Sequence, residues 1–393
     1  MPLYVKGKSL EYISSYTTDR YAAEQTHVAA NNKKRRLRPS TVIARVLIVF
    51  AVTLLLIVIA LYGVMLILTH GPSESAKRLF VMSVKETSAG GFLADMCLSR
   101  DEVDAILAEK AAAVDRMQNT EQNTDLITIG GDKNDDKTPS DGSSDNSTDG
   151  SNTDNTSTAE IVAQGDGIRV EQVSGGTYNG VMMIVDDPKR VFVGIPDAYG
   201  EDKKGLSLKR LIEKYGAIGG TNAGGFADPG GMGNGGVPKG AVIKDGELKY
   251  GSMNGSYSMV GIDGDGILHV GTMSPKSALD AGVRDAVSFG PALIINGTPC
   301  NSGGSLSGGF NPRTAIGQRS DGAMLMLVIN GRSIGSLGAT LDDLVSVMLD
   351  YGAVNASNLD GGASSLMMYD GGTMNNSAYV YGERVLPNAI LVK

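Results

Sequence analysis

An uncharged run of 23 residues, Val46 to Leu68, constrains this chain more than any other feature. At about 1.5 Å rise per residue, it forms a helix long enough to cross a hydrocarbon core of about 30 Å. A cleaved secretory signal is the alternative, but its apolar region is only about 7–15 residues long and ends in small residues. This run ends in Leu66, Ile67 and Leu68. The sequence therefore predicts an uncleaved transmembrane helix at residues 46–68, with the lipid bilayer as a partner.

Basic residues cluster on the N-terminal side of this run. Lys33, Lys34, Arg35, Arg36 and Arg38 precede it, together with Arg45, whereas Lys77 and Arg78 follow it. An excess of Lys and Arg marks the cytoplasmic flank of a membrane helix. Residues 1–45 are therefore expected to be a cytoplasmic tail, with everything after His70 outside the cell membrane. A membrane topology signal that contacts anionic lipid head groups accounts for this basic cluster. No nucleic-acid partner is therefore expected.

Residues 73–118 are rich in helix formers and predict a helical stalk. Ser99 is expected to cap the second of its two helical segments, with Glu102 completing a capping box. The same segment carries a narrow apolar stripe suited to packing or to self-association, formed by Val103, Ile106, Leu107 and Val114.

Residues 130–160 consist almost entirely of Asp, Ser, Thr, Asn and Gly, and predict a disordered acidic linker. Such a composition buries too little apolar surface to offset the entropy of ordering. A calcium loop was considered because Asp recurs, but the required Glu is missing after Asp141 and Gly142. The two cysteines, Cys97 and Cys300, lie on either side of this linker and suggest no disulfide framework.

Residues 161–393, called the C-terminal domain below, alternate short apolar runs with Gly-rich turns. The chain has 53 Gly and no Trp, which favours a turn-rich domain over a helical bundle. Asp245-Gly246 and Asn296-Gly297 predict tight hairpins. Two helices are expected, one in LSLKRLIEKYG and one in TLDDLVSVMLDYG, with Thr340 as an N-cap and Gly at each C-terminal end. The predicted fold class is α+β, with a mixed, largely antiparallel sheet and few helices.

Four segments of this domain place a polar residue beside glycines at the end of an apolar run, where sites commonly lie. They are GGTNAGGFADPGGMGNGGVPKG around Asn222, SFGPALIINGTP around Gly290, NPRTAIGQRSDGAMLMLVINGR around Arg313, and NLDGGASSLMMYDGG around Asp360. In this order, with the helix TLDDLVSVMLDYG between the third and fourth, they resemble the phosphodiester glycosidase family. Members of that family remove sugars from phosphodiesters, and many bacterial ones are linked to exopolysaccharide or wall polymers. Asn222-Ala223-Gly224-Gly225 and Ala363 depart modestly from the family pattern.

The resemblance implies a hydrolase that cleaves the glycosidic bond of a sugar phosphodiester. A carboxylate stabilises the oxocarbenium-like transition state or attacks the sugar, and Asp360 is the first choice, with Asp228 as the second carboxylate. Asn222 is expected to bind a sugar hydroxyl or to orient water. For both carboxylates a turn-forming role is the structural alternative.

Arg313 is the first candidate for the phosphate because its planar guanidinium matches two oxygens of a phosphodiester. Its structural alternative is an Arg that bonds carbonyl oxygens at strand ends. The other predicted substrate-binding residues are Arg332, Gly225, Gly290, Thr314, Gly361, Gly362 and Ser364.

A serine hydrolase is excluded because the C-terminal domain has one histidine, His269, and no Gly-x-Ser-x-Gly elbow. No cofactor is required, and calcium or magnesium held by Asp360 or Asp228 stays open. The sequence thus predicts a membrane-anchored extracellular hydrolase acting on a surface polysaccharide or glycoconjugate and releasing sugar and phosphomonoester. The alternative is a non-catalytic module that binds carbohydrate or anions during exopolysaccharide or cell-wall assembly.

Overall fold

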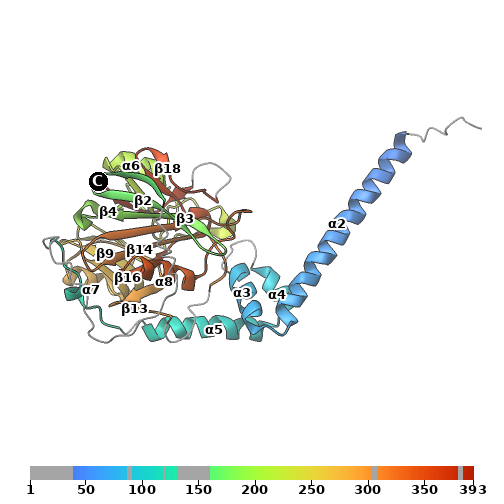
Figure 1. The fold of residues 1–393 in the computed structure, drawn as a ribbon, viewed down its shortest axis with the longest axis horizontal. Coiled ribbons are helices and arrows are strands. Elements are labelled where there is room, and N and C mark those ends of the chain that lie inside the picture. The colour runs from blue at the N-terminus through green and yellow to red at the C-terminus, as the bar shows by residue number, and fades with distance from the viewer. Residues whose placement is uncertain (1–38, 86–90, 118–119, 131–159, 302–307, 379–383) are drawn as a thin grey trace, which may run out of the picture. The chain divides into compact units, whose positions relative to one another are not determined.

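The structure is a computed structural model that describes residues 39–85, 91–117, 120–130, 160–301, 308–378 and 384–393 (Figure 1). Helix α2, Pro39–His70, contains the predicted span. Between Ser40 and His70, an 18-residue window of this helix has a mean hydropathy of 3.1 and is not buried, so the helix is long and apolar enough to cross a membrane. The cytoplasmic tail and almost all of the predicted linker lie outside the described residues.

Three helices form the stalk: α3, Glu74–Lys85, α4, Phe92–Cys97, and α5, Arg100–Met117. The predicted capping box is present, because the Glu102 carboxylate accepts from the Ser99 backbone N–H at 3.1 Å and the Ser99 hydroxyl accepts from the Glu102 N–H at 3.3 Å. The apolar stripe of α5 packs inside the stalk, where Val103 joins Val81, Ala94 and Leu98 and contacts Ile106 and Leu107. The Val114 side chain lies outside the described residues.

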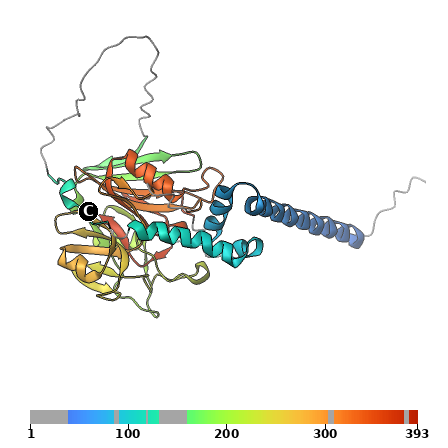
Figure 2. The same ribbon diagram turned by 90° about the horizontal axis from the view of Figure 1, so that it is seen from below.

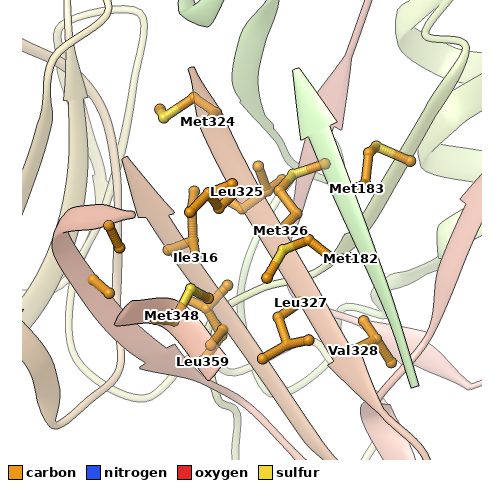
Figure 3. Packing of buried hydrophobic residues seen from close by; sticks show 14 of the residues in the cluster. Met182, Met183, Ile316, Met324, Leu325, Met326, Leu327, Val328, Met348 and Leu359 are labelled. Atoms are coloured by element: carbon orange, nitrogen blue, oxygen red, sulfur yellow. The ribbon is translucent and has the colours of Figure 1, made fainter. Parts of the chain in front are cut away.

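The largest sheet of the C-terminal domain has eight strands, all paired antiparallel. Their order is β1 Ile161–Gly165, β2 Ile168–Ser174, β3 Asn179–Val185, β15 Met324–Ile329, β14 Arg313–Arg319, β16 Ala353–Leu359, β12 Ala292–Ile295 and β13 Thr298–Pro299. The central strands β3 and β15 are buried along nearly their whole length, so they are continuous apolar runs rather than alternating ones. Met182, Met326, Leu327 and Met348 belong to this core, with the side chains of the successive residues Met326 and Leu327 on opposite faces of the sheet (Figure 3).

Two five-stranded antiparallel sheets complete the domain. One has the order β10 Leu268–Met273, β9 Tyr257–Asp263, β11 Val283–Ser288, β7 Val242–Lys244 and β8 Glu247–Tyr250. The other has the order β18 Gly372–Thr373, β17 Met367–Tyr369, β6 Gly219–Asn222, β20 Ala389–Val392 and β4 Val191–Gly194. The short strands β5 Leu206–Ser207 and β19 Val385–Leu386 pair separately.

Helices of the domain are α6, Leu208–Tyr215, α7, Pro275–Asp280, and α8, Leu341–Asp350. Helix α6 ends at Gly216, whose φ of 59° gives the predicted left-handed C-cap. Helix α8 begins at Thr340, which forms a capping box with Asp343, and packs on β16 and β12 across a face of the eight-stranded sheet (Figure 2). The predicted α+β class is confirmed. Helix α7 was not predicted, although Ser274 and Pro275 form a good N-terminal signal for it.

Both predicted hairpin turns are confirmed. Asp245 and Gly246 have φ values of 53° and 73° and join β7 to β8. Asn296 and Gly297 have φ values of 54° and 72° and join β12 to β13. Two successive positive φ values match the right-handed twist of the paired strands, which is why Asp-Gly and Asn-Gly predict them.

Candidate active site

Backbone and side-chain hydrogen bonds bring three of the four singled-out segments together. The Asp360 N–H donates to the carbonyl of Ala223 at 2.8 Å, and the Gly362 N–H donates to the carbonyl of Pro312 at 2.8 Å. The fourth segment joins through β12, where Asn358 of β16 donates to the Gly290 carbonyl at 2.8 Å. The ends of β6, β16 and β14 therefore meet around the Asp360-Gly361-Gly362 turn.

Asp360 follows β16 and is half-buried at the centre of this arrangement. Burial raises the pKa of its carboxyl to about 6, and the charge of Asp228 also raises it. A hydrogen bond from Ser364 and the positive charges of Arg384 and Lys239 oppose that rise. A carboxyl that titrates near neutral pH while facing several charged groups has the properties expected of a catalytic group.

Asp228 lies on the loop after β6 and uses both of its carboxylate oxygens within the protein. Its Oδ1 accepts from the Gly233 N–H at 2.6 Å, and its Oδ2 pairs with the Arg384 guanidinium. Arg384 is 5% exposed, donates to the Gly231 carbonyl at 3.1 Å, and stacks over the Phe226 ring at 4.8 Å. The ion pair fixes the Asp228 loop and places a second carboxylate close enough to raise the pKa of Asp360.

Asn222 ends β6 and is fully buried. Its amide nitrogen donates to the Asp360 carbonyl at 2.5 Å, and its amide oxygen accepts from the Thr314 hydroxyl at 2.8 Å and from the Leu366 N–H at 3.1 Å. Asn222 and the buried Thr314 thus connect β6, β14 and the Asp360 turn. Their side-chain contacts here are to the protein, and these contacts position Asp360.

The two predicted arginines differ in their surroundings. Arg313 is buried, and its Nε and Nη2 donate to the carbonyls of Ala339 and Gly309 at 3.0 and 2.7 Å. This arrangement corresponds to the structural alternative of the sequence analysis. Arg332 is exposed and has a φ of 59°, and its Nη2 donates to the Asn311 Oδ1 at 3.2 Å. Burial of its guanidinium, together with the charge of Arg313, lowers the pKa of Arg332.

Glycines let neighbouring groups approach closely where the segments meet. A Cβ on Gly225 would lie 2.8 Å from the Phe289 ring, and one on Gly361 would lie 2.8 Å from the Pro312 carbonyl oxygen. Gly362 has a φ of 62°, and a Cβ there would lie 3.5 Å from the Arg332 Nη2. Gly290 abuts Ser258, whose Oγ would lie 2.1 Å from an added Cβ. Side chains at Gly225, Gly290 and Gly361 would therefore displace these neighbours, and one at Gly362 would be strained by the positive φ.

Sequence reasoning missed Arg384 and Lys239, and also two buried polar atoms near Asp360. The Asn358 Oδ1 and the Ser365 Oγ have no hydrogen-bond partner within the described residues. Buried polar atoms without partners are uncommon in native proteins and often belong to sites that take a ligand or water. Among the described residues, no group of three or more His, Cys, Asp or Glu could hold a metal ion. His269 lies elsewhere, on β10, with its Nε2 2.9 Å from the Asp263 Oδ2.

Comparison with known proteins finds a similar family. The model of the phosphodiester glycosidase family matches residues 215–393. The SPbeta prophage-derived uncharacterized protein YomE of Bacillus subtilis is 38% identical over 101 residues, which are 25% of this chain and 16% of that protein. This chain therefore matches only a small part of the length of that relative.

Two solved structures are similar at low sequence identity. The catalytic domain of zebrafish N-acetylglucosamine-1-phosphodiester α-N-acetylglucosaminidase, auto-inhibited by its pro-peptide, is 19% identical with a TM-score of 0.47, covering 57% of this chain and 81% of that one. A hypothetical protein from Synechocystis is 18% identical with a TM-score of 0.44, covering 60% and 64%. Residues 215–393 of this chain are therefore similar to the phosphodiester glycosidase family.

Proposed function

We propose that the C-terminal domain hydrolyses the glycosidic bond of a sugar phosphodiester in a surface polysaccharide or glycoconjugate, releasing free sugar and a phosphomonoester. The observation that carries this proposal is Asp360, a carboxyl with a raised pKa that faces Asp228, Arg384 and Lys239 at the meeting point of the family's segments. The enzyme named in the zebrafish structure acts on an N-acetylglucosamine-1-phosphodiester, which is the same class of bond.

In this proposal the ionised Asp360 stabilises positive charge at the anomeric carbon or attacks it, and phosphate leaves with the bonding electrons. A phosphomonoester is a good leaving group, so little acid assistance is needed. Arg332 holds the phosphate, because this residue is exposed overall, its guanidinium lies beside Gly362, and its Nη2 donates to the Asn311 Oδ1. Lys239, exposed and close enough to Asp360 to oppose the rise in its pKa, provides a second positive charge.

Arg313, Asn222 and Thr314 position these groups in the same proposal. Arg313 holds the carbonyls of Gly309 and Ala339 and adds positive charge next to Arg332. Phe289, which lies over Gly225, offers a ring face to a sugar. The partnerless Asn358 Oδ1 and Ser365 Oγ provide buried polar atoms that sugar hydroxyls can satisfy.

Hydrolysis in heavy-oxygen water tests which bond breaks. The full chain in detergent is incubated with alkyl diesters of hexose and N-acetylhexosamine 1-phosphates, and both products are analysed by mass spectrometry. Cleavage of the glycosidic bond places the heavy oxygen on the sugar, whereas phosphodiesterase chemistry places it on the phosphate. Label on the phosphate contradicts the proposal. Binding without turnover across the panel favours the alternative, a non-catalytic module that binds carbohydrate or anions.

The proposal also puts this domain outside the cell, on a single-pass anchor whose N-terminus is cytoplasmic. It is supported by the apolar helix α2 and by the five basic residues at positions 33–38, against Lys77 and Arg78 on the other side. In intact cells, an epitope tag at Met1 is expected to resist external protease, while one after Lys393 is removed. The opposite pattern would place the domain in the cytoplasm.

A further inference from the structure

Residues 121–129, which follow the stalk, lie along the surface of the C-terminal domain in both views of the molecule (Figures 1 and 2). They contain a single turn of 3-10 helix, η1, Thr124–Leu126, which begins where the Asn123 side chain accepts from the Asp125 N–H. Their sequence lacks periodicity, so nothing in it predicts a docked element. We call these residues the docking segment.

The docking segment bonds the edge of a sheet. Strand β10 is the first in its sheet and pairs with β9 on one side, which leaves the main-chain groups on the other side of the buried Leu268 and Val270 without a partner strand. The Gln122 amide covers it, since its Nε2 donates to the Leu268 carbonyl at 2.6 Å and its Oε1 accepts from the Val270 N–H at 2.9 Å. Gln122 thus substitutes for part of a neighbouring strand, beside Gln318, whose Oε1 accepts from the Leu268 N–H at 2.7 Å.

Two hairpin turns hold the rest of the docking segment. The Asn296 side chain accepts from the Asn123 N–H at 2.7 Å and donates to the Glu121 carbonyl at 2.9 Å. The Thr128 N–H donates to the Ser320 carbonyl at 2.8 Å. Ile127 is 7% exposed, and a Cβ on Gly322 would lie 3.0 Å from the Ile129 side chain. The segment therefore has five hydrogen bonds to three separate places on the domain, together with buried apolar surface.

This arrangement changes the role expected for the acidic linker. The docking segment ends at residue 129 on the domain, and beyond the linker the Glu160 carbonyl accepts from the Gln172 N–H of β2 at 2.8 Å. Both flanks of residues 131–159 thus lie on the C-terminal domain. Helix α3 of the stalk also lies against the domain, since a Cβ on Gly309 would lie 2.0 Å from the Ser83 Oγ. We propose that the docking segment, together with this contact and not the acidic linker, attaches the C-terminal domain to the stalk and its membrane anchor, so that the linker can be cut without releasing the domain.

The test uses the full chain in detergent, with a specific protease site in place of residues 141–147 and an affinity tag at Met1. After complete cleavage, verified on a denaturing gel, the fragment ending at Lys393 is expected to stay on the affinity resin.

Gln122→Glu keeps the acceptor for the Val270 N–H but places a carboxylate oxygen against the Leu268 carbonyl. Asn296→Asp keeps the acceptor for the Asn123 N–H but places a carboxylate oxygen against the Glu121 carbonyl. Asp also tolerates the positive φ at this position.

Each substitution is expected to speed release of the cut fragment about tenfold, equivalent to roughly 1.4 kcal/mol. Glu121→Gln is the matched control, because Glu121 contributes only its main-chain carbonyl to these bonds, and it should behave as wild type. Urea unfolding of the uncut variants checks that the domain itself is intact. Prompt release of the wild-type fragment overturns the proposal, and so does undiminished retention of the Gln122→Glu, Asn296→Asp double variant.

Discussion

Replacement of Asp360 by Asn is expected to lower kcat about 10³-fold while making the folded domain more stable at neutral pH. The amide keeps the size of the side chain but lacks the charge that an oxocarbenium-like transition state requires. The gain in stability follows from the pKa of about 6, which burial raises from an ordinary value of 3.8. Between these two values the folded state binds the proton and the unfolded state does not.

The free energy of unfolding of the wild type therefore falls as pH rises from about 4 to about 6 and stays reduced above pH 6. Two pKa units correspond to at most about 3 kcal/mol, and the partly exposed position of Asp360 reduces this to about 1–3 kcal/mol. Asp360→Asn should recover that amount at pH 7.5 and nothing below pH 4. Urea unfolding of both proteins at these two pH values measures the difference.

Asp228→Asn is the matched control for this experiment, and its stability should change in the opposite direction. Asp228 neutralises the buried Arg384, so the amide leaves an uncompensated guanidinium and should destabilise the domain by about 3 kcal/mol. Its effect on turnover should be smaller than that of Asp360→Asn, because the leaving phosphate needs little acid assistance. Near wild-type turnover in folded Asp360→Asn would return Asp360 to a turn-forming role.

Arg313→Lys is expected to lower the free energy of unfolding by about 2–3 kcal/mol and to reduce turnover with it. A lysine at this buried position cannot reach the carbonyls of both Gly309 and Ala339 with the fixed geometry of a guanidinium. A buried carbonyl without a partner destabilises the fold by about 1–3 kcal/mol. Thermal or urea unfolding, measured beside kcat/KM, gives both quantities.

Arg332→Lys provides the comparison at the same site. Arg332 is exposed, and within the part of the chain that the structure describes its side chain donates to Asn311, so stability should change by no more than about 0.5 kcal/mol. Turnover should still fall about 10²-fold, since the ammonium cannot bind two phosphate oxygens side by side. If Arg313→Lys instead loses activity with unchanged stability, Arg313 and not Arg332 holds the phosphate.

Local sequence predicted the local structure well wherever one short segment contains all the interacting groups. The capping box at Ser99, the N-cap at Thr340 and the hairpin turns at Asp245 and Asn296 formed as expected, because their partners lie within three residues. Helix α7 had the same kind of signal at Ser274 and was overlooked beside longer apolar runs. The docking segment had none, because Gln122 finds its partners 146 and 148 residues further along the chain.

The sequence by itself determined the apolar membrane-length helix, the strand-rich C-terminal domain, and the four segments that resemble the phosphodiester glycosidase family. Only the tertiary structure decided which polar side chains in those segments are available to a ligand. Asn222 bonds to groups 92, 138 and 144 residues away, and Arg384 reaches Asp228 across 156 residues. A sequence motif specifies that a polar group is present, but its partners come from distant strands. Folding therefore decides whether that polar group bonds to other parts of the protein or can bind a ligand.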